Sequence, residues 1–197
     1  PAPPPADCPP VRDPRRSMPF TPPFSLVNGL SLRAFNTLHY WCQPARRKRA
    51  VAHYRPYFYP LDGIGHWNRM YGPRGFMQHQ CVLPPAHASD GVAALLKEIS
   101  RSGHGSFLAV LKEFGSIPSL GMLSFPRPGT TLALDFPNTG LDVFRLLDRL
   151  DAIVAEAGGA IYPAKDARMS PAIFRSCYPR LQEFSCHIDP AFSSGLW

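Results

Sequence analysis

This sequence lacks a long apolar run. None of its segments approaches the roughly 20 apolar residues that cross a membrane, so the sequence predicts no transmembrane segment. Its first residues have no apolar core of the kind found in secretory signals, and we expect no signal peptide there. The five cysteines are odd in number and widely spaced, which does not resemble a disulfide framework. Cysteines without a disulfide pattern favour a reducing compartment, and we therefore expect a cytoplasmic protein.

Several motifs of catalysis and binding are also missing. Gly63-Ile64-Gly65 and Gly103-His104-Gly105 each begin a G-x-G, but neither continues to a third glycine that opens a helix. The cysteines and histidines show no paired C-x-x-C or H-x-x-x-H spacing, so we expect no metal site. There is no G-x-S-x-G nucleophile motif, and Cys81 within an apolar strand is typical of a core residue.

Proline and positive charge are abundant, and both are concentrated in the first half. Ten of the 24 prolines lie in residues 1–23, which we expect to form an extended, disordered lead-in. Residues 1–89 carry 11 Lys and Arg against 3 Asp and Glu, a net charge of +8; residues 90–197 carry 10 against 11, a net charge of −1. The basic run Arg46, Arg47, Lys48, Arg49 is the centre of the positive half.

The hydrophobic pattern predicts an α+β fold. A short helix is expected over Leu30–Tyr40, and a basic, proline-broken loop over Gln43–Pro60. After that, strands and helices follow in the order strand, helix, strand, strand, helix, strand. This is the β-α-β-β-α-β order of the ferredoxin-like fold, an antiparallel sheet with helices on one face, here with irregular N- and C-terminal extensions. The expected strands are Phe76–Leu83, Ser106–Phe114, Thr130–Phe136 and Ala160–Tyr162. The first expected helix is capped by Ser89 or Asp90 and ends before Gly103, and the second follows a Thr139/Asp142 capping box. A further helix is expected within Met169–Tyr178.

Four polar residues in or beside these strands are candidates for chemistry. Lys112 and Lys165 are lone lysines in or just after apolar strands; each either extends to the surface or lines a cleft, where it could stabilise negative charge. Gln78 and Gln80 share one strand face with Phe76 and Val82, and buried amides need hydrogen-bond partners, which suits a polar substrate or cofactor edge.

Five longer motifs resemble a known family. YPLDGIGHWNRMYGPRGFMQHQCVLP (59–84), GHGSFLAVLKEFG (103–115), LSFPRPG (123–129), LDFP (134–137) and GGAIYPAKDAR (158–168) occur in one order at sensible spacings. Together they resemble the C-terminal half of FAD-linked oxidases of the vanillyl-alcohol oxidase type, and above all the decaprenylphosphoryl-β-D-ribose 2'-oxidase group. Aldonolactone oxidases, including D-arabinono-1,4-lactone oxidase, are more distant relatives.

The resemblance implies a division of labour between two halves of a flavoenzyme. In that family an N-terminal domain binds FAD and a C-terminal cap domain with an antiparallel sheet forms the substrate pocket. Residues 24–162 would be the cap domain and residues 163–197 a segment returning to an FAD-binding domain outside this sequence. The implied reaction is oxidation of a sugar hydroxyl, on a polyprenyl-phosphate pentose or related sugar, by hydride transfer to the flavin. A partner reductase and peripheral membrane contact are further implications, and nucleic acid is not an expected partner.

The resemblance also assigns roles to particular residues. Lys165 matches the family's lysine that faces flavin and substrate, with Tyr162 lining the same site. Gln78 and Gln80 match the family's glutamine pair, with Gln80 also near the cofactor. The remaining substrate-binding matches are Leu108, Lys112 and Phe114 in the pocket wall, with Thr131 and Ala133 where the family has Asn and Cys.

Two other interpretations remain open at the level of sequence. The Arg46–Arg49 loop could make this a catalytically inert module that contacts nucleic acid or an acidic partner. The chain could also be a fragment without an independent role.

Overall fold

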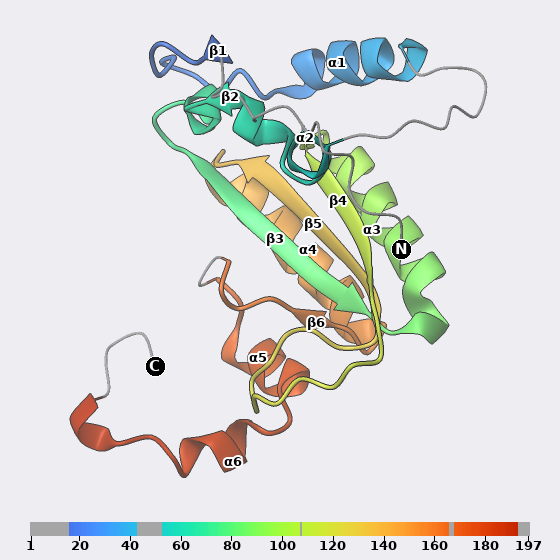
Figure 1. The fold of residues 1–197 in the computed structure, drawn as a ribbon, viewed down its shortest axis with the longest axis vertical. Helices are drawn as coiled ribbons and strands as arrows, with labels where there is room; N and C mark the ends of the chain where they lie inside the picture. The colour runs from blue at the N-terminus through green and yellow to red at the C-terminus, as the bar shows by residue number, and fades with distance from the viewer. Residues whose placement is uncertain (1–15, 43–52, 107, 166–167, 193–197) are drawn as a thin grey trace, which may run out of the picture. The chain divides into compact units, whose positions relative to one another are not determined.

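The computed structural model describes residues 16–42, 53–106, 108–165 and 168–192 (Figure 1). The chain divides into two compact units, Pro1–Gly75 and Phe76–Trp197. The basic run 46–49 and most of the proline-rich lead-in lie outside the described residues. The sequence-based boundaries 1–23, 24–162 and 163–197 stay predictions.

The first unit contains short elements and one longer helix. Strand β1 (Arg16–Ser17) pairs in parallel with β2 (Ile64–Gly65), and α1 spans Gly29–Trp41. The expected helix is therefore confirmed, and its cap is Asn28, whose Oδ1 accepts the N–H groups of Leu30 and Ser31. The remaining elements are α2 (Tyr54–Phe58) and the 3-10 helices η1 (Pro60–Gly63) and η2 (Trp67–Tyr71). The expectation of a loop throughout Gln43–Pro60 is therefore wrong for α2.

The second unit has the predicted ferredoxin-like topology. Its strands are β3 (Phe76–Leu83), β4 (Ala109–Phe114), β5 (Gly129–Pro137) and β6 (Ala160–Ile161), in the sheet order β4-β5-β3-β6. Every neighbouring pair is antiparallel. The helices are α3 (Ala88–Ser102) and α4 (Leu141–Glu156). The 3-10 helix η3 (Pro85–His87) comes directly before α3. The α+β prediction and the strand order are confirmed.

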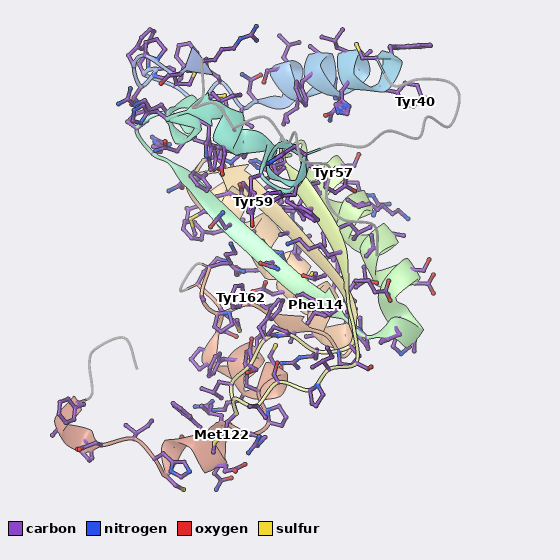
Figure 2. The ribbon with its side chains drawn as sticks, in the orientation of Figure 1. Tyr40, Tyr57, Tyr59, Phe114, Met122 and Tyr162 are labelled. Carbon is purple, nitrogen blue, oxygen red and sulfur yellow. The ribbon has the colours of Figure 1, made fainter. Side chains whose placement is uncertain are left out.

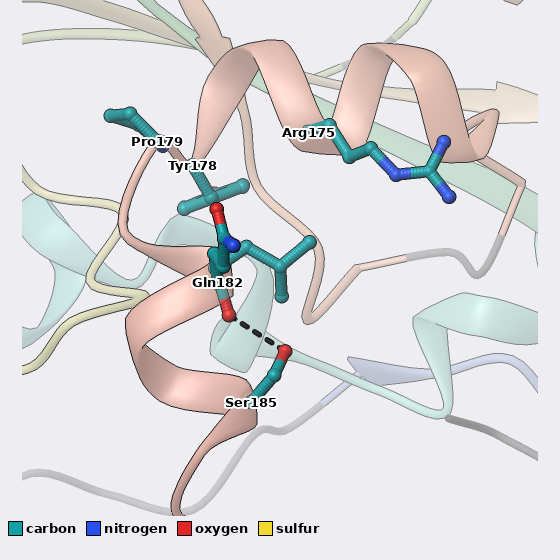
Figure 3. A pocket seen from close by; sticks show the side chains of 6 residues that line it. Arg175, Tyr178, Pro179, Gln182 and Ser185 are labelled. Atoms are coloured by element: carbon teal, nitrogen blue, oxygen red, sulfur yellow. Dashed lines mark hydrogen bonds between the residues drawn. The ribbon is translucent and has the colours of Figure 1, made fainter.

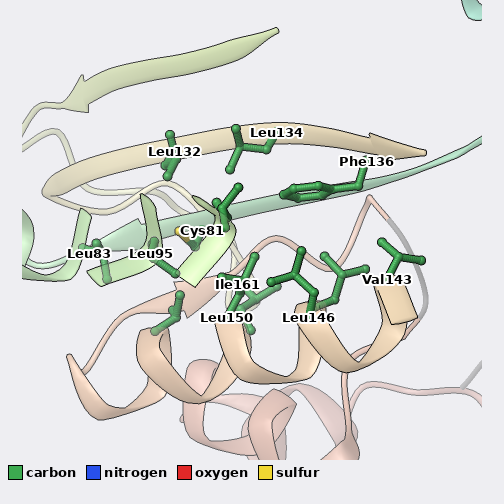
Figure 4. Packing of buried hydrophobic residues seen from close by; sticks show 13 residues of the cluster. Cys81, Leu83, Leu95, Leu132, Leu134, Phe136, Val143, Leu146, Leu150 and Ile161 are labelled. Atoms are coloured by element: carbon green, nitrogen blue, oxygen red, sulfur yellow. The ribbon is translucent and has the colours of Figure 1, made fainter. Parts of the chain in front are cut away.

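The main core lies between one face of this sheet and helices α3 and α4 (Figure 4). Cys81 and Leu83 of β3 and Leu132, Leu134 and Phe136 of β5 point toward the helices. The alternation of apolar residues along each strand places them on a common face, and the three-to-four spacing along each helix supplies the opposing surface. This packing leaves the opposite face of the sheet to Gln78, Gln80 and their neighbours.

A second cluster covers one end of that opposite face. It contains Val82, Phe125, Ala160, Cys177 and Tyr178, and it brings the 115–128 segment and α5 (Pro171–Cys177) onto the sheet. Helix α5 lies within the predicted range Met169–Tyr178 and is capped by Ser170. The Tyr178 hydroxyl donates a hydrogen bond to the Ile161 carbonyl at 2.7 Å. The other end of this face is not covered by that cluster.

Three local predictions about this unit are wrong. The Thr139/Asp142 capping box does not form: Gly140 is the cap of α4 without a side-chain bond, and Asp142 lies near Arg145. Helix α3 begins at Ala88, so neither Ser89 nor Asp90 caps it. Strand β4 begins three residues later than expected. The Ser106 hydroxyl bonds the backbone of Leu108 in a local turn, which competes with strand pairing.

Two short elements near the C-terminus had no signal in the sequence. These are α6 (Leu181–Ser185) and the 3-10 helix η4 (Pro190–Phe192). Neither is long enough to show a hydrophobic period, so only the structure reveals them.

Candidate functional site

A cavity of about 180 Å³ opens on the sheet face that α3 and α4 do not cover. Six of the nine residues that the sequence singled out line it: Gln78, Gln80, Leu108, Lys112, Ala133 and Lys165. The other lining residues are His79, Val110, Leu134 and Asp135. Residues from four separate segments of the sequence therefore meet in one place.

Strand pairing brings these side chains together. In β3, Gln78 and Gln80 point to the same face because successive side chains alternate. The antiparallel register sets Gln80 opposite Ala133 and Gln78 opposite Asp135, while Lys112 of β4 lies opposite Thr131. Pocket residues on three adjacent strands thus project from the same side of the sheet.

The two glutamine amides are held by neighbours on β5. Gln78 Nε2 donates to Asp135 Oδ1 at 3.0 Å, and Gln80 Nε2 donates to Thr131 Oγ1 at 3.2 Å. Thr131 is itself buried, so it orients Gln80 without lining the cavity. These bonds fix the plane of each amide before any ligand binds, which reduces the entropy lost on binding.

Lys165 reaches the pocket from the segment that follows β6. The backbone N–H of Tyr162 donates to the Gln80 carbonyl at 2.8 Å, which extends the pairing of β6 with β3 by one residue. The backbone N–H of Lys165 in turn donates to the Tyr162 carbonyl at 3.4 Å. This turn places a second cation at the cavity beside Lys112.

Phe114 and Tyr162 belong to an aromatic cluster instead of the cavity wall. The Tyr162 ring stacks on Phe125 with centroids 4.7 Å apart, and Phe114 meets Phe125 edge-on at 5.9 Å. Phe114 and Tyr162 lie near each other at one end of the sheet (Figure 2). Arg127 ties this cluster to the end of α5 by donating to the Cys177 carbonyl at 3.0 Å.

Asp135 and Val110 are pocket residues that the sequence reasoning missed. The strand spacing could have identified both residues, because side chains two positions apart lie on the same face of a strand. Asp135 follows Thr131 and Ala133 at this spacing on β5, and Val110 precedes Lys112 by two positions on β4. The pocket therefore combines two cations, two amides and one carboxylate with apolar side chains. Such a mixture suits a ligand that carries hydroxyl groups and negative charge.

A second cavity, of about 400 Å³, lies between α5 and α6 (Figure 3). Its lining includes Arg175, Gln182 and Ser185, and the Ser185 hydroxyl donates to the Leu181 carbonyl at 2.8 Å. None of the residues predicted from the sequence lines it.

The described part of the chain shows neither a metal-binding cluster nor a membrane-spanning helix. Its His, Cys, Asp and Glu residues form no group of three or more that could hold a metal ion. Among the same residues, no helix is long and apolar enough to cross a membrane.

Known proteins resemble this chain over most of its length. It is 38% identical over 180 residues to decaprenylphosphoryl-beta-D-ribose oxidase of Mycolicibacterium smegmatis, a match that covers 88% of this chain and 38% of that protein. The resemblance to the decaprenylphosphoryl-ribose oxidase group is confirmed. A link to arabinono-lactone oxidases stays a prediction.

A second relative extends the comparison. The chain is 32% identical over 176 residues to an uncharacterized protein in the mprA 5' region of Streptomyces coelicolor, which covers 85% of this chain and 46% of that protein. The chain thus spans less than half the length of both curated relatives. No family model matches the sequence.

Proposed function

We propose that this chain forms the substrate-binding half of an FAD-dependent oxidoreductase that oxidises a sugar hydroxyl. The observation that carries the proposal is the joint presence of Gln78, Gln80, Lys112 and Lys165 around one cavity, in a chain similar to decaprenylphosphoryl-beta-D-ribose oxidase. The proposed substrate is a polyprenyl-phosphate pentose or a related sugar.

The pocket residues fit the edge of a flavin and the hydroxyls of a sugar. Lys165 lies on the turn that follows β6 and lines the cavity, where its ammonium could face both the cofactor and the substrate. Gln80 lies on β3, one of the two inner strands, and could bind either the cofactor or the substrate. When bound, FAD would supply the hydride acceptor, the one chemical group that no side chain provides. The stacked rings of Phe125 and Tyr162 lie outside the cavity lining and support the segment that leads to Lys165.

In this mechanism the protein side chains orient the alcohol and stabilise charge. The carbon of the carbinol would give up a hydride to the bound acceptor, its hydroxyl would give up a proton to a base or to water, and a carbonyl would remain. The amides of Gln78 and Gln80 would hold neighbouring hydroxyls, since each is already oriented by β5. The cations Lys112 and Lys165 would stabilise the negative charge that develops on oxygen and attract a phosphate group.

The rival binding-module function has less support. Its basic run, 46–49, lies outside the described residues. In the described sheet, β4 contributes one cation, Lys112, and strands β3, β5 and β6 contribute none, so the sheet does not offer the basic surface that nucleic-acid binding requires.

A chimera tests the proposal. This chain would replace the matching part of the Mycolicibacterium smegmatis relative, and flavin reduction by a polyprenyl-phosphate pentose would be followed by absorbance. We expect a yellow protein in which Lys165→Ala lowers the reduction rate about 100-fold or more, because a cation preorganised at developing charge is lost. The matched control is Lys97→Ala on α3, which does not line the cavity and should leave the rate unchanged.

Two results would contradict the proposal. A chimera that folds but holds no flavin would remove the cofactor assignment. An unchanged reduction rate in Lys165→Ala would remove the role of this lysine. Salt-sensitive binding of random DNA by the chain alone would instead favour the binding module.

A further inference from the structure

A buried ion pair lies directly behind the candidate pocket, on the helix side of the sheet. Asp151 of α4 is 1% exposed, and both of its carboxylate oxygens are bonded. Oδ1 lies 3.1 Å from Nε2 of His79, and Oδ2 accepts a hydrogen bond from Nη2 of Arg168 at 2.7 Å. Arg168 also donates to Asp148 at 2.8 Å, so its guanidinium is held on two sides.

This network joins the two segments that carry the polar groups of the pocket. His79 lies in β3 between Gln78 and Gln80, and its side chain is buried on the opposite side of the strand. Arg168 follows Lys165 by three residues. One carboxylate on α4 is therefore bonded both to the strand of the two glutamines and to the segment that carries the lysine.

Lys165 consequently lies between two fixed points in the sequence. Three residues before it, Tyr162 is held by its backbone bond to Gln80 and by stacking on Phe125. Three residues after it, Arg168 is held by its two carboxylates and is only 12% exposed. Three residues reach at most about 10 Å, so these two attachments limit how far the backbone of Lys165 can move while both remain in place.

Stability alone is a weak reason for this arrangement. Removing charged groups from water is expensive, and a buried ion pair is often no more stabilising than well-packed apolar residues of similar size. The surrounding core is apolar, with Leu147, Leu150 and Val154 on the same helix. The geometry of the network, in contrast, has a direct consequence for where Lys165 lies.

We infer that Asp151 and Arg168 are positioning residues, which hold the Lys165 ammonium at the pocket beside Lys112. They do not touch the cavity themselves. The catalytic meaning of this inference rests on the proposed function, but the placement of Lys165 can be measured in the chain itself, without flavin or substrate.

The experiment measures how often the two pocket lysines meet. The full chain is treated with difluorodinitrobenzene, a short reagent that links two amines, and the Lys112–Lys165 product is quantified by mass spectrometry against modification of the exposed Lys97. In Arg168→Met we expect the yield of this product to fall roughly threefold or more, because a loosened segment lowers the effective concentration of one amine near the other. The matched control, Arg149→Met, removes the Arg149–Glu98 pair between α3 and α4 and should leave the yield unchanged.

A second pair of variants applies if Arg168→Met does not fold. Asp148 is 70% exposed, so Asp148→Asn should keep the fold while it weakens one of the two bonds to Arg168, and we expect a smaller fall in yield. Its control is Asp142→Asn, an equally exposed carboxylate of α4 that lies near Arg145. Thermal unfolding of each variant shows whether it is folded at the temperature of the reaction.

The outcomes separate positioning from a structural role. An unchanged Lys112–Lys165 yield in a folded Arg168→Met or Asp148→Asn variant would overturn the inference, even if its melting temperature falls. A reduced yield, together with lowered flavin reduction in the chimera that Arg168→Lys partly restores, would support it. If the unmodified chimera reduces no flavin, the proposed function fails, while the linking result still decides the positioning of Lys165.

Discussion

Raising the pH should destabilise the second unit through one buried thiol. Cys81 lies in β3, is 0% exposed and faces the core formed with α4. The pKa of its thiol is raised from 9.0 to about 12, mainly by burial. A backbone hydrogen bond from Leu132 lowers this pKa, and the nearby carboxylate of Asp151 raises it further. In the unfolded chain the same thiol would ionise near its ordinary pKa of 9.0.

The sign and size of the effect follow from linkage. Between pH 9 and pH 12 the unfolded state loses this proton while the folded state keeps it, so the free energy of unfolding falls as pH rises. The contribution is fully present below pH 9 and is lost as pH approaches 12. A difference of three pKa units corresponds to about 4 kcal/mol in total, and to about 2 kcal/mol at a pH near 10.5.

Urea unfolding of the chain and of Cys81→Ala at about pH 8 and about pH 10.5 measures this contribution. Other groups titrate in the same range, including Tyr178, whose pKa is raised by burial. They are common to both proteins, so the difference in pH dependence isolates Cys81. We expect the variant to lose about 2 kcal/mol less stability than the parent between the two pH values. Equal losses in both proteins would refute the reasoning.

Two substitutions test the sheet beneath the pocket. Gly129→Ala should destabilise the fold by about 1–3 kcal/mol in thermal unfolding, because this residue has a φ of 145° and a Cβ there would overlap the Leu83 carbonyl; an unchanged melting temperature would contradict this. Thr131→Val keeps the side-chain shape but removes the acceptor of the Gln80 amide, so the chimera should bind ribose 5-phosphate roughly fivefold more weakly in calorimetry. Equal affinity would show that Gln80 does not depend on this hydrogen bond.

Much of the second unit could be predicted because its segments have clear periods. The ends of Phe76–Leu83 and the shared face of Gln78 and Gln80 were predicted correctly, because side chains two apart lie on the same face of a strand. The helix around Leu147 also has a regular apolar stripe. Caps and short elements were predicted less well: α4 begins at Leu141 after Gly140, which caps it without a side-chain bond, and α6 is too short to show a period.

The sequence by itself determined the longer helices and strands, the ferredoxin-like order of the second unit and, through the family resemblance, a set of polar residues that could bind a sugar and a flavin. Alternation and helical spacing are local properties, and they survive in the one-dimensional pattern. Only the tertiary structure decided which residues meet: that Asp135 accepts from Gln78, that Thr131 accepts from Gln80, and that Asp151 is bonded to both His79 and Arg168. These contacts depend on strand register and on the packing of α4 against the sheet, and neither is set by neighbours in sequence.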